Sequence, residues 1–363
     1  MLRLMSIGRF LLMGAASAMV VTACGGPTAG SPSPSADVGS GSIIGAGATF
    51  PKPLYDKAFY DYSQKYPQVT VNYPGGGSGA GISQFIANTV DFGASDVPMA
   101  ASDITKAGGP DVLTQIPTTL GVVSIAFNVS GVRSLKLDGP TLAGIFLGTI
   151  KNWNDPAIAA LNPGTTFPNK AIKVVHRSDG SGTTYHFTDY LSKVSPQWKD
   201  TTKSPSKSIS WPTGTGQSGN AAVAQQITAE DGTIGYVELA YVVQNQMKQA
   251  ALKNVAGKFV TASVEGATAA AATNTSVSPT NFSITNAPGD TSYPIAAFSW
   301  VILRTSYSDA NKGKAIVNLF KWLVTSGQTE GKDLQYATLP SEVQTLAVNN
   351  LKTIKAGGSA VLS

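Results

Sequence analysis

The chain of 363 residues is longer than one hydrophobic core usually requires, so we expect two domains. With 13% charged residues, 38 Gly and 21 Pro it is rich in loops, but 42% hydrophobic residues exclude global disorder. A net charge of +5 without a run of Lys and Arg argues against nucleic-acid binding. The single Cys excludes an internal disulfide, and two His (His176 and His186) almost exclude a zinc enzyme, so we expect no metal and no cofactor.

The N-terminus has the pattern of an export signal. Residues 1–10 carry only positive charge, and residues 11–21, LLMGAASAMVV, are apolar but shorter than the ~20 residues of a membrane-spanning helix. We therefore predict a signal peptide over 1–23. Its end, VTAC, resembles the bacterial lipobox, in which the Cys becomes the acylated first residue, so Cys24 is the predicted lipidation site. The alternative is an ordinary signal peptide followed by an incidental Cys.

The next segment, 24–42, consists almost entirely of Gly, Pro, Ser and other small residues. Such a composition cannot bury a core, so we predict a flexible tether. The folded part is then expected to begin near Ile43, outside the cell and lipid-anchored to the outer face of the cell membrane through Cys24.

Hydrophobic periodicity predicts alternating strands and helices in the rest of the chain. The expected strands are 43–44, 68–73, 90–94, two within 112–129, 171–177, 233–237 and 293–304. The expected helices are 53–66, 82–86, 183–194, 220–228, 310–325 and 340–354. This alternation indicates an α/β fold with mostly parallel sheets.

Three glycine-rich turns each connect a predicted strand to a predicted helix, at 45–50, 75–81 and 178–184. The first N–H groups of a helix lack internal partners and carry positive potential, and glycines let a ligand approach the backbone. Because such turns lie at the carboxyl ends of strands, where α/β folds bind ligands, we predict an anion site. The alternative is that Gly and Ser serve here only as turn and capping residues.

Two enzyme-like patterns overlap the second turn. Gly75, Gly77 and Ala80, with Asp96 further on, fit a dinucleotide-binding fingerprint, but an exported lipoprotein has little access to NAD. Residues 76–80 nearly fit a hydrolase nucleophile elbow, but the last position is Ala and the chain offers few candidate bases.

Six segments together resemble one family. They are GAGATFP (45–51), GGGSG (75–79), DFGASD (91–96), GIFLGTIKNW (144–153), RSDGSGT (177–183) and GTIGYVE (232–238). From about Ile43 to near the C-terminus, the chain resembles the phosphate-binding lipoproteins of the bacterial Pst phosphate ABC importer, which are periplasmic-binding proteins.

The resemblance implies a two-lobed clamshell of the type II periplasmic-binding-protein class, each lobe a mostly parallel sheet flanked by helices. Lobe one would comprise 43–126 plus 296–363 and lobe two 127–295, with a hinge near Phe127 and Ala296. It also implies a monomer that is not an enzyme, captures inorganic phosphate in the cleft and delivers it to a membrane permease. The implied phosphate contacts are Thr49, Phe50 through its backbone N–H, Ser78, Asp96, Arg177, Ser181, Gly182 and Thr183, with Asp179 holding Arg177.

Asp96 is the informative member of this set, because a carboxylate should repel an anion unless the anion brings a proton. Phosphate at neutral pH carries a proton and sulfate does not, so Asp96 would select phosphate. The alternative is that Asp96 caps the turn before Pro98. Two other functions remain open: a secreted phosphatase or esterase on the same fold, and a surface adhesin or immunogen.

Overall fold

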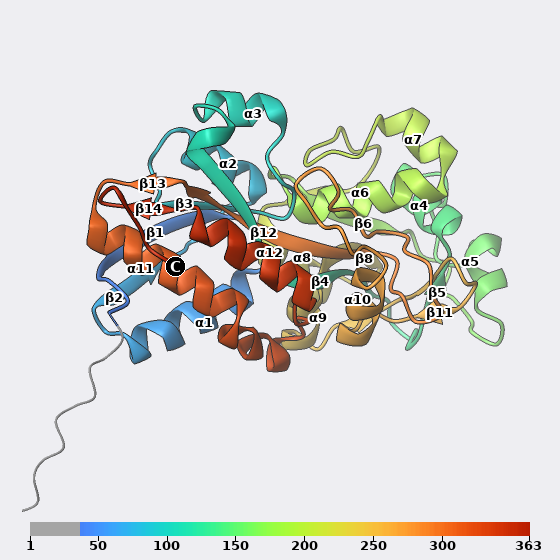
Figure 1. Ribbon diagram of the computed structural model, residues 1–363. Helices are drawn as coiled ribbons and strands as arrows, with labels where there is room; N and C mark the ends of the chain where they lie inside the picture. The colour runs from blue at the N-terminus through green and yellow to red at the C-terminus, as the bar shows by residue number, and fades with distance from the viewer. Residues whose placement is uncertain (1–36) are drawn as a thin grey trace, which may run out of the picture. The chain divides into compact units, whose positions relative to one another are not determined.

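The computed structural model describes residues 37–363 (Figure 1). The predicted signal peptide, Cys24 and most of the predicted tether lie outside these residues. Strand β1 (Gly41–Gly47) begins two residues before the expected start at Ile43, and Val38 is already buried.

The structure is built on a nine-stranded sheet with the order β2-β1-β3-β12-β4-β8-β6-β7, in which β9 also pairs with β4. Besides β1 its strands are β2 (Val69–Asn72), β3 (Phe92–Ser95), β4 (Leu113–Asn128), β6 (Lys173–Arg177), β7 (Thr215–Gln217), β8 (Thr233–Glu238), β9 (Lys248–Gln249) and β12 (Ala296–Arg304).

Strand direction divides this sheet into two lobes. In lobe one, β1, β2 and β3 are parallel, and β12 runs antiparallel to β3 and to β4. In lobe two, β8, β6 and β7 are parallel to one another and antiparallel to β4. The two parallel groups therefore run toward each other, and their carboxyl ends meet near the middle of β4. This arrangement confirms the α/β class and the mostly parallel strands within each lobe.

Strand β4 corrects one sequence expectation, because 112–129 holds one long strand rather than two. Its first part, Leu113–Val122, pairs with β12, and its second part, Val123–Asn128, pairs with β8. The register skips Thr118 beside Pro117, so the strand bulges at the residue that follows the proline. A bulge accommodates a residue without an N–H group. The strand therefore continues past Pro117, where the sequence predicts that a strand ends.

Helices cover both faces of the sheet (Figure 1). They are α1 (Lys52–Lys65), α2 (Ser78–Ile86), α3 (Ala101–Lys106), α4 (Gly139–Leu147), α5 (Pro156–Leu161), α6 (Gly182–Val194), α7 (Pro196–Thr202), α8 (Gly219–Ala229), α9 (Leu239–Gln244), α10 (Val264–Ala271), α11 (Ala310–Val324) and α12 (Ser341–Lys352), with 3₁₀ turns η1 (Pro110–Val112) and η2 (Ser326–Leu334). Within 37–363, none of the helices has both the length and the apolar character needed to cross a membrane.

Two small sheets complete the fold. The first contains β5 (Lys136–Leu137), β10 (Ala251–Lys253) and β11 (Phe259–Val260), and the second contains β13 (Ser306–Tyr307), β14 (Lys355–Ala356) and β15 (Ser359–Ala360).

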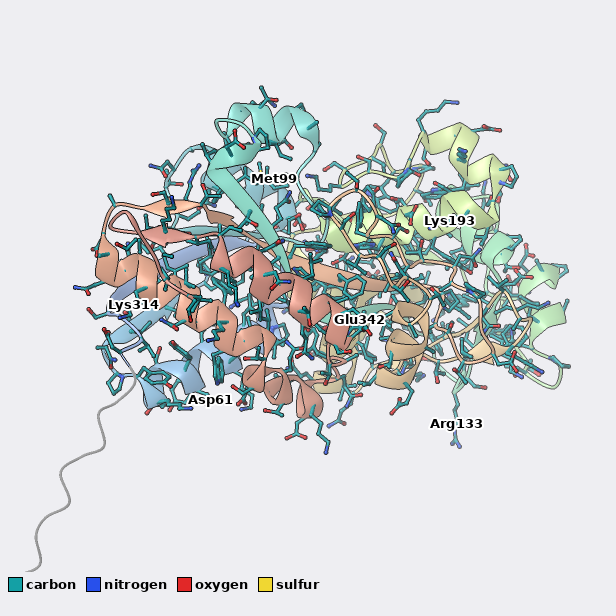
Figure 2. The ribbon with its side chains drawn as sticks, in the orientation of Figure 1. Asp61, Met99, Arg133, Lys193, Lys314 and Glu342 are labelled. Carbon is teal, nitrogen blue, oxygen red and sulfur yellow. The ribbon has the colours of Figure 1, made fainter. Side chains whose placement is uncertain are left out.

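The core of lobe one lies on both faces of its sheet. Alternating residues of β12 belong to different clusters: Val301 and Leu303 pack in the large core with Phe320 of α11, whereas Ile302 packs with Phe85 of α2. Because successive side chains of a strand point to opposite faces, this alternation places α2 and α11 on opposite sides. The sheet is thus buried on both faces, and only its strand ends remain for a ligand (Figure 2 shows the side chains around it).

Candidate anion-binding site

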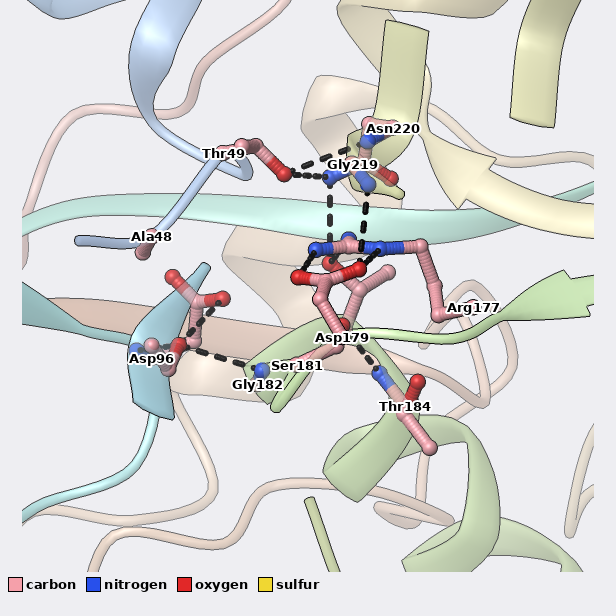
Figure 3. Close-up of polar contacts among 12 residues, drawn as sticks. Ala48, Thr49, Asp96, Arg177, Asp179, Ser181, Gly182, Thr184, Gly219 and Asn220 are labelled. Carbon is pink, nitrogen blue, oxygen red and sulfur yellow. Dashed lines mark hydrogen bonds and ion pairs between the residues drawn. The ribbon is translucent and has the colours of Figure 1, made fainter. Parts of the chain in front are cut away.

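Polar residues from both lobes gather where the carboxyl ends of the strands meet (Figure 3). From lobe one, Thr49 follows β1 and Asp96 follows β3. From lobe two, Arg177 ends β6 and Asp179 follows it. The N-termini of α2, α6 and α8 begin beside them, so backbone N–H groups surround the same region.

Glycine and serine set the starts of two of these helices. Gly77 precedes α2 with φ 92°, and a Cβ there would lie 2.2 Å from Asp179 Oδ2, so only glycine fits. Ser181 caps α6, and its Oγ accepts the N–H of Thr184 at 3.0 Å. Both helices therefore begin in the site with their positive ends directed into it.

Arg177 is held by Asp179. The Arg177 Nε donates to Asp179 Oδ1 at 2.6 Å and Nη2 donates to Oδ2, which makes a bidentate pair. The N–H of Gly219 also donates to Asp179 Oδ1, at 3.0 Å. Burial alone would raise the pKa of Asp179, but the hydrogen bond and charge of Arg177 outweigh it and hold the pKa below its usual value. Since Asp179 takes one edge of the guanidinium, a ligand can use only the remaining Nη hydrogens.

Asp96 is 1% exposed and lies among hydrogen-bond donors. Its Oδ1 accepts the hydroxyl of Ser299 at 2.7 Å, and its Oδ2 lies 3.4 Å from the Oγ of Ser78. Burial raises the pKa of Asp96 to about 7, against the opposing effects of the Ser299 hydrogen bond and the Arg177 charge. These donors come from other segments of the chain, which favours a role in the site over capping of the following turn.

The two lobes touch across the site. The N–H of Gly182 in lobe two donates to Oγ of Ser78 in lobe one at 3.1 Å, and the N–H of Gly79 donates to the carbonyl of Gly180 at 2.7 Å. The Nε2 of His186 lies 2.8 Å from the carbonyl of Asp96. The lobes are therefore closed on each other in this structure.

The structure gathers the residues expected from the sequence in this one region. Thr183 Oγ1 accepts from Arg177 Nη1 at 3.3 Å, and Phe50 is buried beside Thr49 with its carbonyl accepting the Tyr336 hydroxyl at 2.6 Å. The complete set is Thr49, Phe50, Ser78, Asp96, Arg177, Asp179, Ser181, Gly182 and Thr183. Their contacts with phosphate stay a prediction.

Sequence reasoning missed Asn220, the second residue of α8. Its fully buried side chain joins Thr49 of lobe one to Thr183 of lobe two. The available signal was a fourth turn of the same kind, GQSGN at 216–220, which also leads from a strand into a helix.

Sequence reasoning also gave no role to Glu238, a buried residue at the end of β8. The Tyr336 hydroxyl lies within hydrogen-bond distance of both the Phe50 carbonyl and Glu238 Oε2, the latter at 3.0 Å. The hydroxyl has one hydrogen to share between these two acceptors, and Glu238 Oε2 also accepts the N–H of Ala240 at 2.8 Å. Burial raises the pKa of Glu238 well above its usual value, against the opposing hydrogen bonds of Ala240 and Tyr336, and so favours a neutral carboxyl group.

Comparison with known proteins agrees with this fold. Residues 31–326 match the family model described as a PBP superfamily domain. The chain is 46% identical over 306 residues to the phosphate-binding protein PstS of Pasteurella multocida, covering 83% of this chain and 87% of that protein. It is 42% identical to the PstS protein of Xylella fastidiosa, covering 82% of this chain and 81% of the relative.

Solved structures share the fold. The phosphate-binding protein of Stenotrophomonas maltophilia has a TM-score of 0.67 at 20% identity, covering 89% of this chain and 98% of that one. A putative phosphate ABC transporter substrate-binding protein from Clostridium perfringens, solved with bound phosphate, has a TM-score of 0.61 at 16% identity, covering 83% and 100%. With its fold shared by these structures and its sequence by the PstS relatives, this chain belongs to the PstS family of phosphate-binding proteins in the PBP superfamily.

Proposed function

We propose that this protein captures inorganic phosphate between its two lobes and delivers it to the membrane permease of an ABC importer. The observation that carries the proposal is one buried carboxyl group, Asp96, among donors from three helix N-termini, Arg177 and several hydroxyls. The names of the PstS relatives, which are phosphate-binding proteins, agree with it.

The donors and the carboxyl group fit the two halves of phosphate chemistry. Phosphate has several acceptor oxygens, which suit backbone N–H groups, hydroxyls and the free Nη hydrogens of Arg177. It also carries a proton near neutral pH, and Asp96, whose burial raises its pKa to about 7, can share that proton. A single proton between Asp96 and the anion therefore satisfies both groups, whereas an unprotonated anion leaves two like charges in contact.

Closure would be part of capture. We take lobe one as 43–126 plus 296–363 and lobe two as 127–295, with a hinge near Phe127 and Ala296. The partner change of β4 at Val122 and Val123 lies close to this hinge and supports it. Opening would expose the strand ends to solvent, and closure around phosphate would form the surface that the permease recognises.

A secreted phosphatase or esterase is the alternative function, but the relatives are named as binding proteins. One experiment separates the two functions. Ligand-stripped protein is incubated with radiolabelled phosphate and, separately, with a chromogenic phosphate ester. A binding protein retains about one phosphate per chain and does not turn the ester over. Repeated turnover, or no retained phosphate, would overturn the proposal.

Membrane anchoring is a further part of the proposal, in which an acylated Cys24 holds a monomer at the outer face of the cell membrane. It rests on the lipobox-like end of the predicted signal peptide. Cys24→Ser is expected to block processing or release the protein from membranes. Mass spectrometry of the mature N-terminus checks this, and an unmodified N-terminus with unchanged membrane association would contradict it.

A further inference from the structure

The side chain of Asn220 is fully buried and lies between the two lobes (Figure 3). Its Nδ2 is 3.0 Å from Oγ1 of Thr49 in lobe one and 3.1 Å from Oγ1 of Thr183 in lobe two. Both hydroxyls belong to the residues that the proposed function assigns to phosphate. Asn220 thus contacts two phosphate-binding candidates at once.

A third contact fixes which way the amide of Asn220 points. The backbone N–H of Glu238 donates to its Oδ1 at 3.1 Å. A backbone N–H can only donate, so the atom that faces it must be the oxygen. The NH₂ group therefore faces the two threonines, and each of its hydrogens is given to one hydroxyl oxygen.

Counting lone pairs then fixes the direction of both hydroxyl hydrogens. A hydroxyl oxygen accepts at most two hydrogen bonds. Thr49 Oγ1 receives Nδ2 and, at 3.2 Å, the backbone N–H of Asn220. Thr183 Oγ1 receives Asn220 Nδ2 and Arg177 Nη1. With both lone pairs filled, each threonine can use its hydroxyl only as a donor.

We propose that Asn220 is a positioning residue that turns the hydroxyls of Thr49 and Thr183 into obligatory donors toward the anion. This inference rests on the proposed phosphate-binding function. Asn220 does not touch the anion but removes the alternative in which a hydroxyl oxygen faces it and repels its lone pairs. Because it engages one hydroxyl from each lobe, it completes the donor set only in the closed arrangement.

The test is a mutant cycle with a matched control. Asn220→Ala frees both hydroxyls to rotate and is expected to weaken phosphate binding by about 10-fold. Asn162 is the control, because it is also buried, donates twice through Nδ2 and accepts once through Oδ1, but bonds Lys136 and Ile158. Asn162→Ala is expected to leave the affinity unchanged.

The cycle shows whether Asn220 acts through the hydroxyls. In a Thr49→Val, Thr183→Val background, Asn220→Ala is expected to change the affinity by less than about 2-fold, because no hydroxyl remains to be oriented. An equal loss in both backgrounds overturns the inference, as does a parental affinity in Asn220→Ala. If the parent itself retains no phosphate, the proposed function is wrong and this inference is wrong with it. If the parent binds phosphate but the cycle gives either of the results above, only this inference is wrong.

A second variant keeps the test decisive if Asn220→Ala does not fold. Asn220→Asp preserves the volume but presents an acceptor, so both hydroxyl hydrogens turn toward residue 220 and away from the anion. Protonation of the new carboxyl restores one donor, so the affinity deficit relative to the parent should shrink between pH 9 and pH 5. A deficit that is independent of pH would indicate a purely structural role and overturn the inference.

Discussion

Asp96 lies in a cluster of donors, and we expect its protonation state to decide which anions the site binds. Burial raises its pKa to about 7, so the protonated form is favoured below that pH and the carboxylate above it. A carboxylate accepts the proton of a phosphate and repels sulfate. A neutral carboxyl can donate to either anion, so selectivity against sulfate should be lost as the pH falls through about 7.

The first prediction follows from this titration. In the parent, sulfate should compete weakly with phosphate at pH 8 and better at pH 5.5. In Asp96→Asn, whose amide can donate at any pH, it should compete about 100-fold better at pH 8 than in the parent. Calorimetric titration of ligand-stripped parent and variant measures the affinity for each anion. Arsenate is the control: it carries a proton, so it should compete with phosphate in the parent and in the variant. Equal discrimination against sulfate in the variant at pH 8 would remove Asp96 as the selecting residue.

The second prediction concerns Arg177, one edge of which is bound to Asp179. Arg177→Lys keeps a positive charge but loses the planar group that contacts Asp179 and Thr183 and that we propose for the anion. We expect at least about 100-fold weaker phosphate binding. The ligand-free melting temperature should change little, because a cation remains beside Asp179. Asp179→Asn should weaken binding less, since Asp179 acts on the site through Arg177 and through the N–H of Gly219. Parental affinity in Arg177→Lys would show that the anion does not use this side chain.

At the scale of elements, the sequence predicts local features such as turns and helix starts better than it predicts which distant segments pair or pack together. The glycine turns before α2 and α6 were predicted because positive φ angles and caps require particular residues, such as Gly77 and Ser181. The unbroken β4 could not be predicted, since the bulge at Thr118 depends on β12, which lies far along the chain. The turn before Asn220 is visible in the sequence, but the contacts of its side chain are not, because they form only where four separate segments meet.

The start of α6 gives the third prediction. A Cβ at Gly182 would lie 2.5 Å from Asp96 Oδ2 and 2.7 Å from Ser78 Oγ, both in lobe one. Gly182→Ala should therefore hold the lobes apart and weaken phosphate binding by about 100-fold or more. The ligand-free melting temperature should hold, since alanine favours helix. Gly79→Ala, whose Cβ would meet Gly180 Cα at 3.2 Å, should lose less. Equal affinities for parent and Gly182→Ala would contradict the closed arrangement as the binding form.

At the scale of the whole molecule, the lobes join by contacts that opening must break. Besides those in the site, the Tyr241 hydroxyl of lobe two donates to the Thr49 carbonyl of lobe one at 2.7 Å. Both lobes also share β4, which limits the motion to bending around its middle. We therefore expect the free energy of anion binding to stabilise the closed arrangement of the lobes over the open one.

The fourth prediction is that phosphate makes the described part of the chain more compact. Small-angle scattering of ligand-stripped protein should show a smaller radius of gyration after phosphate is added. Phosphate at about 100 times its dissociation constant should also stabilise the fold by ~2.7 kcal/mol. Tyr241→Phe should bind a few-fold more weakly for loss of one hydrogen bond. Gly182→Ala is the control that should not contract, and an unchanged parental radius would contradict the closure mechanism.

The position of β12 has a consequence for how the chain acquires its structure. This strand, Ala296–Arg304, inserts between β3 and β4, which come much earlier in the sequence. Before β12 is synthesised, β3 and β4 each have an unpaired edge, so the sheet of lobe one is incomplete. Pairing over such sequence separation is slow, and a chain emerging N-terminus first stays incompletely folded until nearly all of it is available. A chain that folds so late stays unfolded during synthesis. An unfolded chain is the form that can pass through a translocation channel.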